Sequence, residues 1–372
     1  MELLQLTAER NILYNSLWDG TSPTTTGPGT LVSRHGYIIN HQEPYSTQQP
    51  SMDLSAYTLI PALIDCHIHI AMPYHSQSSP AVHAQNLLHA GVVAARDAGA
   101  NEITPCFFPP LTIIPTLQAI SKAGYYGENL GTPVATIQEA EDMITHLASL
   151  GAKQIKVIAS GIFSFSSYGQ IGPAPFSAAE LTRIVQHATQ HGLPVMAHAS
   201  GDEAVSRCLQ AGVHSIEHGY FMQRDTLKMM AEKQIHWVPT LAPVAAQLEV
   251  AEISASLSER EKNTIKRSLD RQMQLVAFAR DLGVSIGAGT DAGAHGVPHG
   301  SSLPYEVSLL HQCGLTTREA LMAATSTAAA ICGLPDYGSL MQGKKAVILA
   351  LRENPLHDLC ALQTPAFLCL PS

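Results

Sequence analysis

The chain has 372 residues, with 21 lysines and arginines against 30 aspartates and glutamates, which gives a formal net charge of −9. This length fits one large α/β domain, alone or with a smaller companion. A hydrophobic fraction of 45% with 14% charged residues excludes a disordered chain. The acidic balance argues against nucleic acid or an anionic membrane surface as a partner. Histidine, with 18 residues, is unusually frequent and favours metal binding.

Cysteine usage and the N-terminal residues bear on the cellular compartment. Residues 1–10 lack the positive and long apolar regions of a secretory signal. The longest uncharged apolar stretch, 320–335, falls short of the roughly 20 residues that span a bilayer. The seven cysteines are odd in number and contain no C-x-x-C pair, so no disulfide framework is indicated. We therefore predict a cytoplasmic protein with no membrane partner.

The first 60 residues predict short strands separated by turns rich in Thr, Pro, Gly and Gln. The expected strands cover 11–18, 29–39 and 57–60. A further β-like run at 345–351 could pair with them. We therefore predict a small β-sandwich domain built from residues 1–60 together with 340–372.

Between these ends, apolar strands alternate with helical patterns. The expected strands are 63–70, 92–96, a third within 111–120, 154–159, 194–198, 215–218, 236–241 and 284–290. The expected helices are 81–90, 137–150, 177–191, 201–211, 224–233, 259–282 and 316–332. Repeated βα units with nearly continuous apolar strands indicate a parallel sheet covered by helices. About eight such strands favour a (β/α)8 TIM barrel over residues 61–339.

Metal-ligand residue types recur at the C-terminal ends of these strands, where the active sites of barrels lie. His67 and His69 are two apart on a strand, so both side chains point to the same face. His198 and His218 are one βα unit apart and therefore belong to adjacent strands. Each histidine alone is more often a structural imidazole. Lys156 and Asp291 lie at two further strand ends, and the whole pattern predicts metal binding at this rim.

Seven segments together resemble the metal-dependent amidohydrolase superfamily, and in particular its imidazolonepropionase-like and Xaa-Pro dipeptidase-like branch. They are LIPALIDCHIHI (59–70), GVVAARDAG (91–99), IKVIASG (155–161), PVMAHASG (194–201), SIEHG (215–219), GAGTDAG (287–293) and GSLMQGK (338–344). The resemblance covers nearly the whole chain, including the β-domain shared by both ends.

This resemblance implies a site for two divalent metal ions, usually zinc. His67, His69 and Asp291 would hold one ion, and His198 with His218 the other. Lys156 would be carboxylated on Nζ so that its carbamate bridges both, because an unmodified lysine is a cation and repels a metal. Deaminases of the superfamily typically hold one metal without a lysine ligand, so Lys156 favours the binuclear type.

The implied activity is hydrolysis of an amide C–N bond in a small molecule, such as a dipeptide or an N-acyl amino acid. Two cations lower the pKa of a bridging water, and Asp291 would accept its proton and deliver it to the leaving nitrogen. The alternatives are a deaminase or cyclic-amide hydrolase, a lactonase, and a barrel that binds a ligand without catalysis. A small-molecule substrate is the only partner we predict, and the sequence also allows a homo-oligomer.

The loops after the strands indicate the type of substrate. Loops 71–82, 98–110, 160–176 and 292–306 contain no lysine or arginine, whereas a phosphate or several carboxylates ordinarily require an arginine. We therefore expect a neutral or singly charged substrate with an apolar or aromatic part, oriented by Tyr168, His295 or His299. The aromatic residues of these loops are Tyr74, Phe107, Phe108, Phe163, Phe165, Tyr168 and Phe176.

Two further features lie near the expected rim of the barrel. Arg96 and Asp97 follow the second strand, and we expect an internal ion pair at this point. The run GYYG at 124–127 stands where many members of the superfamily have a His-Gly pair. The substrate preference of those members therefore does not carry over directly.

Overall fold

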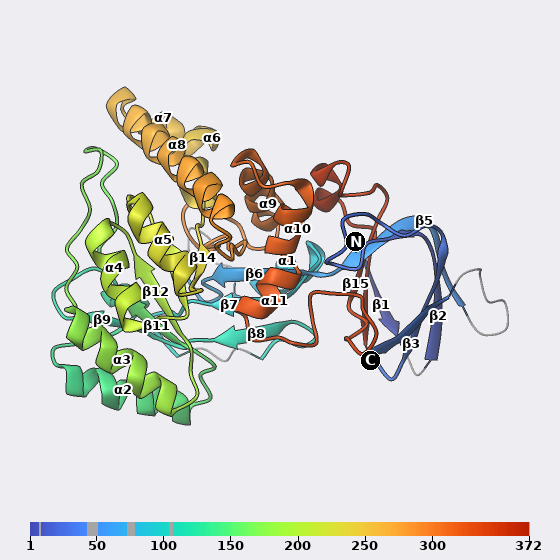
Figure 1. Ribbon diagram of the computed structural model, residues 1–372, viewed down its shortest axis with the longest axis horizontal. Coiled ribbons are helices and arrows are strands. Elements are labelled where there is room, and N and C mark those ends of the chain that lie inside the picture. Colours follow the sequence, from blue (N-terminus) through green and yellow to red (C-terminus); the bar gives the residue numbers. More distant parts are fainter. Residues whose placement is uncertain (7–8, 43–50, 73–78, 104–106, 372) are drawn as a thin grey trace.

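The computed structural model describes residues 1–6, 9–42, 51–72, 79–103 and 107–371 (Figure 1). Tyr74, one of the predicted loop aromatics, lies outside these ranges. The described chain forms a region of alternating strands and helices, with a sheet beside it that contains both chain ends. None of the described helices combines the length and the apolar character that a membrane span needs.

The sheet at the chain ends has seven strands in the order β1-β16-β15-β5-β2-β3-β4. Its strands are β1 (Glu2–Leu6), β2 (Glu9–Leu17), β3 (Gly29–Arg34), β4 (Tyr37–Gln42), β5 (Ser51–Pro61), β15 (Ile348–Leu351) and β16 (Phe367–Pro371). The first and last strands of the chain pair in parallel, so both ends contribute to one sheet, as predicted. A two-layered sandwich and the domain boundaries stay predictions. The expected strand 29–39 is wrong, because His35 and Gly36 both have positive φ and form a tight turn between β3 and β4.

The rest of the chain contains two sheets whose strand pairs are parallel, in the orders β6-β7-β8 and β10-β9-β11-β12-β13-β14. Their strands are β6 (Leu63–Ile68), β7 (Val92–Asp97), β8 (Thr112–Pro115), β9 (Ala119–Lys122), β10 (Gly131–Val134), β11 (Ile155–Ile158), β12 (Val195–Ala199), β13 (Ser215–His218) and β14 (His236–Val238). The uncertain third strand is thus two strands: β8 pairs with β7, whereas β9 pairs with β11. Leu117, with φ 69°, lies at the break between them.

Helices lie beside these two sheets along the chain (Figure 1). They are α1 (Pro80–His89), α2 (Ile137–Ser149), α3 (Ala178–Gln190), α4 (Asp202–Ala211), α5 (Arg224–Glu232), α6 (Ala242–Glu249), α7 (Ala251–Ser256), α8 (Glu259–Asp281), α9 (Ser302–Gln312), α10 (Thr317–Ala323) and α11 (Ser326–Ile331), with the 3-10 turns η1 (Glu128–Leu130) and η2 (Leu359–Gln363). Ser177, the expected start of a helix, forms a capping box with Glu180. The expected single helix 316–332 is wrong: Thr325 (φ −133°, ψ −98°) interrupts it between α10 and α11.

The expected strand 284–290 is also wrong, because this segment has only one isolated bridge, at Ile286. Its backbone instead hydrogen-bonds in turn to the edge strands of both parallel sheets. The backbone N–H of Trp237 on β14 donates to the Ser285 carbonyl over 2.9 Å, and the backbone N–H of Asp291 donates to the His67 carbonyl over 2.7 Å. We call residues 284–292 the seam segment, since it lies between β14 and β6. Closure of an eight-stranded barrel stays a prediction.

Candidate metal centre

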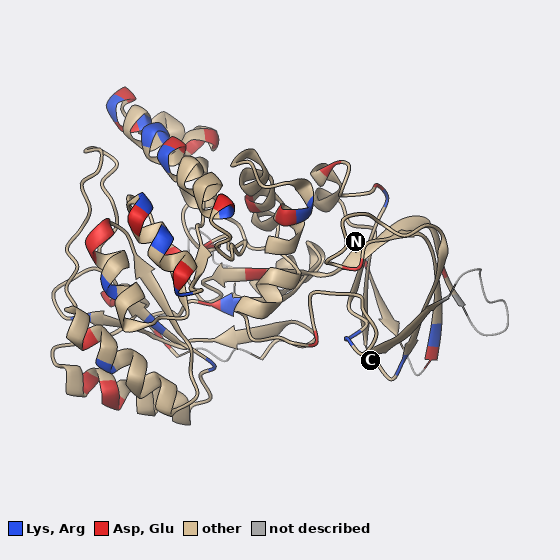
Figure 2. Cartoon of the chain, in the orientation of Figure 1, with Lys and Arg blue, Asp and Glu red and all other residues tan. Residues whose placement is uncertain are grey.

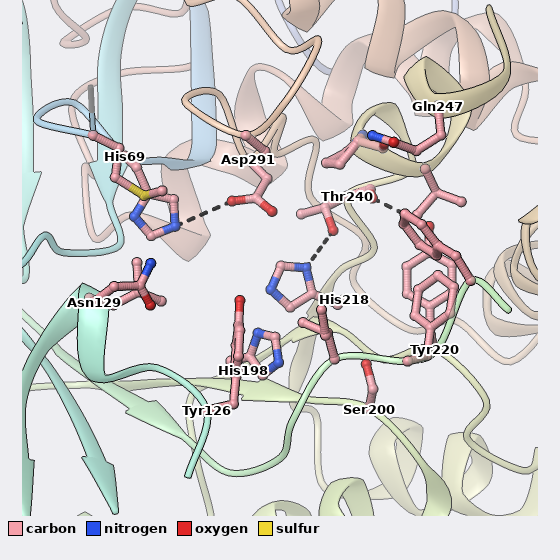
Figure 3. Close-up of a pocket in the computed structure, with 18 of the residues that line it drawn as sticks. His69, Tyr126, Asn129, His198, Ser200, His218, Tyr220, Thr240, Gln247 and Asp291 are labelled. Atoms are coloured by element: carbon pink, nitrogen blue, oxygen red, sulfur yellow. Dashed lines mark hydrogen bonds and ion pairs between the residues drawn. The ribbon is translucent and has the colours of Figure 1, made fainter. Parts of the chain in front are cut away.

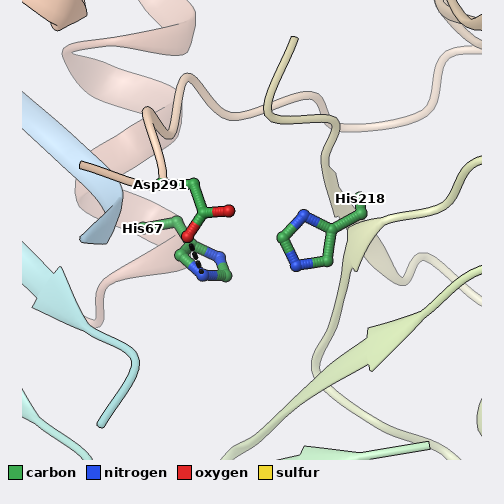
Figure 4. Close-up of side chains that lie close together, drawn as sticks. All are labelled: His67, His218 and Asp291. Carbon is green, nitrogen blue, oxygen red and sulfur yellow. Dashed lines mark ion pairs between the residues drawn. The ribbon is translucent and has the colours of Figure 1, made fainter. Parts of the chain in front are cut away.

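The predicted ligands come together at the ends of the parallel strands (Figures 3 and 4). His67 lies on β6, and His69 follows that strand directly; Lys156, His198 and His218 lie on β11, β12 and β13. These last three strands are neighbours in one sheet, with Ile158 paired to His198 and Ala199 paired to His218. Asp291 comes from the seam segment.

Distances between the side chains show one continuous cluster. The Oδ1 atom of Asp291 is 3.4 Å from Nε2 of His67 and 3.3 Å from Nε2 of His69. Nζ of Lys156 donates to Nε2 of His67 over 3.5 Å. The His218 ring centroid lies 5.1 Å from that of His67 and 4.5 Å from that of His198. One ligand atom each of His67, His218 and Asp291 lies within 4.8 Å of the other two. The structure thus brings all six predicted residues together.

The ring nitrogens that face away from the cluster are held by hydrogen bonds. Nδ1 of His67 donates to Oε2 of Glu217 over 2.7 Å, and Nδ1 of His69 donates to the Gly99 carbonyl over 2.6 Å. Nδ1 of His218 lies 2.7 Å from Oγ1 of Thr240. Partners of this kind fix the tautomer and orientation of metal-binding imidazoles. They leave Nε2 of His67 and of His69 directed towards Asp291.

The electrostatics of the cluster suit a cation. Burial, together with neighbouring cationic groups, lowers the pKa of His67, His198 and His218 well below the usual range, so these imidazoles are neutral. Burial would raise the pKa of Asp291, but His67 and His69 more than offset it, and the net pKa is lowered. Burial also lowers the pKa of Lys156 to about 8.

One atom of the cluster argues directly for a ligand. Nε2 of His198 is buried and has no hydrogen-bond partner among the residues that the structure describes, which is costly for a polar atom. Neutral imidazoles and a carboxylate are the donor set of divalent transition metals. The residues present therefore fit a metal ion. Their assignment as ligands stays a prediction.

Two of these residues have backbone conformations that are unusual outside glycine. His218 has φ 68° and Asp291 has φ 55°. The side chains of Trp237 and Gln272 both donate to the His218 carbonyl, which holds it in place. A residue other than glycine in this left-handed backbone conformation costs about 1–3 kcal/mol of conformational free energy, and such residues concentrate at functional sites.

Arg96 and Glu217 form a buried ion pair that holds His67, and the sequence did not predict Glu217 as the partner. The Arg96 guanidinium donates to Oε1 of Glu217 over 2.7 Å and to the Cys66 carbonyl over 2.7 Å. The expected pair between Arg96 and Asp97 is wrong, because successive strand residues point to opposite faces. Asp97 instead accepts from the backbone N–H of Ile70 over 3.0 Å. The sequence did contain one signal for this pair: Glu217 lies inside the buried strand SIEH, and a buried carboxylate requires a partner.

Asp65 attaches the seam segment to β6. Its carboxyl group accepts from the N–H of Thr290 over 3.0 Å and from the Thr290 hydroxyl over 2.7 Å. It also accepts from the N–H of His67 over 3.1 Å. Burial raises the pKa of Asp65 to about 7. This hydrogen bonding places the next residue, Asp291, beside the two histidines of β6.

Gly289 permits the close approach between the seam segment and β6. A Cβ atom at this position would come within 2.8 Å of Cβ of His67. We expect Gly289→Ala to push the segment away, to lower the free energy of unfolding by about 1–3 kcal/mol, and to weaken metal binding. Denaturant unfolding and metal titration measure both effects. Gly27→Ala is the control, because nothing lies within 4 Å of its Cβ position; equal behaviour of the two variants would contradict the prediction.

A cavity of about 240 Å³ opens onto the cluster. Lys156, His198, His218 and Asp291 lie in its wall. Residues that also line it include His69, Tyr126, Asn129, Leu130, Ile162, Phe163, Phe165, Ser200, Tyr220, Thr240 and Gln247. Two of the predicted loop aromatics, Phe163 and Phe165, are thus in the wall. The sequence did not single out Tyr220, Asn129 or Thr240.

The predicted substrate residues lie outside the lining of this cavity. His295 and His299 line a neighbouring cavity of about 880 Å³. The His299 ring stacks on His83 at 4.1 Å, and its Nε2 donates to the His69 carbonyl over 3.1 Å. The Arg267 guanidinium lies 4.0 Å from the centre of the Tyr168 ring. Their role in binding substrate stays a prediction.

The chain thus combines two sheets of parallel strands, histidines at the ends of those strands, and a further sheet that contains both chain ends. The Amidohydrolase family profile matches residues 58–367. The chain therefore belongs to the amidohydrolase family, which confirms the predicted resemblance.

Individual relatives agree with this assignment. The chain is 28% identical over 284 residues to an ochratoxinase from Aspergillus niger, an alignment that covers 75% of this chain. It spans 57% of the length of that relative. A solved Xaa-Pro dipeptidase with bound methionine superposes with a TM-score of 0.84 at 23% identity, covering 98% of both chains. A prolidase-type structure from Bifidobacterium longum gives 0.83 at 25% identity, covering 98% of this chain and 93% of the other.

Proposed function

We propose that the protein is a binuclear metal-dependent hydrolase that cleaves an amide C–N bond in a small molecule with an apolar or aromatic part. The observation that carries the proposal is the cluster itself: neutral imidazoles, a carboxylate and a buried lysine beside a cavity. Phe163 and Phe165 supply an apolar wall for the substrate. The names ochratoxinase and Xaa-Pro dipeptidase, carried by similar proteins, support an amide as the substrate class.

In this proposal His67, His69 and Asp291 hold one ion, and His198 with His218 holds the other. Lys156 is placed to become a ligand of both after its Nζ atom forms a bond to the carbon of CO₂ and releases a proton. Its lowered pKa favours the neutral amine that this reaction needs. When bound, the two ions supply Lewis acidity, which makes a water molecule nucleophilic near neutral pH and polarises the scissile carbonyl.

Asp291 handles the proton. Because its pKa is lowered, the carboxylate is ionised at neutral pH and can accept a proton from the attacking water. The same oxygen can then deliver that proton to the leaving nitrogen, which departs as a neutral amine. Tyr220, whose hydroxyl donates to the Thr240 carbonyl over 3.5 Å, packs against Phe163 at 4.7 Å and helps to exclude water from this part of the wall.

Metal content and lysine carboxylation test the proposal together. We expect two equivalents of a divalent transition metal, usually zinc, per chain, and a protein-bound carbamate signal in ¹³C NMR after addition of labelled bicarbonate. Chelation should abolish amide hydrolysis, and metal with bicarbonate should restore it. Lys156→Met should lose the carbamate signal, whereas Lys153→Met, which changes an exposed lysine nearby, should keep it.

The outcomes separate the alternatives. One equivalent of metal with a free Lys156 would contradict the binuclear proposal and favour a deaminase-type site, with ammonia as the product. A protein that binds no metal under any condition would favour a ligand-binding barrel. Release of a larger amine from N-acyl amino acids or dipeptides is the result that we expect.

A further inference from the structure

Tyr126 occupies a position in the cavity that the proposed chemistry has not yet used. It lies in the turn between β9 and η1, and its ring centroid is 5.2 Å from that of His198. In Figure 3 the hydroxyl end of its side chain points into the cavity, towards the side that carries Asp291 and His218. A substrate carbonyl placed at the cluster would therefore meet this hydroxyl group.

The turn that carries Tyr126 is held firmly against the strand that carries Lys156. Gly127 has φ 106°, and a Cβ atom there would come within 2.8 Å of Cγ1 of Ile158 on β11. On the other side of Tyr126, the N–H of Gly124 donates to Oε1 of Glu128 over 2.7 Å. These contacts hold the backbone on both sides of the tyrosine, and its ring lies against that of His198.

The hydroxyl of Tyr126 is also available as a donor. Within the described part of the chain it makes no hydrogen bond, whereas Oγ1 of Thr240, in the same cavity wall, is paired with His218. A phenol ordinarily has a pKa of about 10 and stays protonated at neutral pH. The group can therefore donate a hydrogen bond without first changing its protonation state.

We propose that Tyr126 donates this hydrogen bond to the carbonyl oxygen of the scissile amide. The bond strengthens as the oxygen gains negative charge in the tetrahedral intermediate, so the residue stabilises the transition state more than the bound substrate. This inference rests on the proposed amide hydrolysis.

The test compares Tyr126→Phe with Tyr125→Phe, the same change at the next residue, which does not line the cavity. For Tyr126→Phe we expect kcat to fall about 100-fold, as on loss of one oxyanion donor, with KM and metal content unchanged. Tyr125→Phe should keep the wild-type kcat. An N-phosphonyl amino acid, which is tetrahedral at phosphorus, should bind Tyr126→Phe more weakly by a similar factor, whereas the free amino acid product should bind both proteins equally.

Several outcomes would overturn the inference: an unchanged kcat, an equal loss in Tyr125→Phe, or loss of metal from the Tyr126 variant. An activated anilide has a leaving group that needs no proton donor. A wild-type kcat of Tyr126→Phe on this substrate would assign Tyr126 as the proton donor to the leaving group instead. Absence of amide hydrolysis by the wild-type protein would refute the proposed function. The phosphonyl comparison needs no turnover, and equal affinity of wild type and Tyr126→Phe would then refute the role of Tyr126 by itself.

Discussion

Asp291→Asn is expected to abolish measurable turnover, with a loss in kcat of the order of 10⁴-fold, the upper range for general acid–base groups. The carboxamide keeps the size of the side chain and one oxygen near His67 and His69. In the wild-type protein, the Nε2 atoms of these histidines lie 3.4 and 3.3 Å from Oδ1 of Asp291. The carboxamide cannot accept the proton of the attacking water. The five other predicted ligands remain, on or directly after β6 and on β11, β12 and β13, so most of the metal should be retained.

Steady-state kinetics and elemental analysis on the same preparation measure these two effects. Asp225→Asn, which alters an exposed carboxylate paired with Lys228, is the control and should be fully active. Full activity of Asp291→Asn would falsify the assigned role. Parallel loss of metal and activity would show that Asp291 matters mainly as a ligand.

Arg96→Met should lower the free energy of unfolding by about 3–5 kcal/mol, because it leaves the buried carboxylate of Glu217 without its cation. Arg96 is 1% exposed and Glu217 is fully buried. Glu217 also accepts from Nδ1 of His67, so the same change should weaken metal binding about 10–100-fold by releasing the orientation of that ring.

Urea denaturation of the apoprotein and metal titration test this prediction separately. The matched control is Arg183→Met, which breaks a half-exposed pair with Glu141 and should cost at most about 1 kcal/mol. The double variant Arg96→Met with Glu217→Gln should recover part of the stability, since no charge is then left unpaired. Equal costs for the Arg96 and Arg183 variants would show that the buried pair has no special role.

The meeting of the four histidines was predictable because their placement follows from strand periodicity. His67 and His69 share a face two residues apart, and His198 and His218 end neighbouring strands, so local patterns determine where these side chains point. Glu217 lies on one of the same strands, but its partner Arg96 comes from β7, and only the folded structure shows that they meet.

Other parts of the site depend on tertiary contacts that leave no periodic signal. The seam segment hydrogen-bonds alternately to two sheets, and its glycines accommodate neighbours rather than a regular ladder, so an apolar run at 284–290 suggested a strand. Tyr126 lies in a turn after β9, in a region where the sequence predicted one strand and the structure has two. The loop residues Tyr168, His295 and His299 were chosen for their chemistry, and loop paths are not determined by sequence spacing.

The origin of the six clustered side chains has a consequence for the cohesion of the fold. His67 and His69 belong to the three-stranded sheet, whereas Lys156, His198 and His218 belong to the six-stranded sheet. Asp291 belongs to the seam segment between them. Anything that binds all three parts at once acts as a cross-link between separate sheets. By mass action, such a ligand raises the free energy of unfolding. Above its dissociation constant, the increase grows with the logarithm of the ratio of ligand concentration to dissociation constant. Under the proposed function, binding of the metal ions would therefore support catalysis and the stability of the fold at the same time.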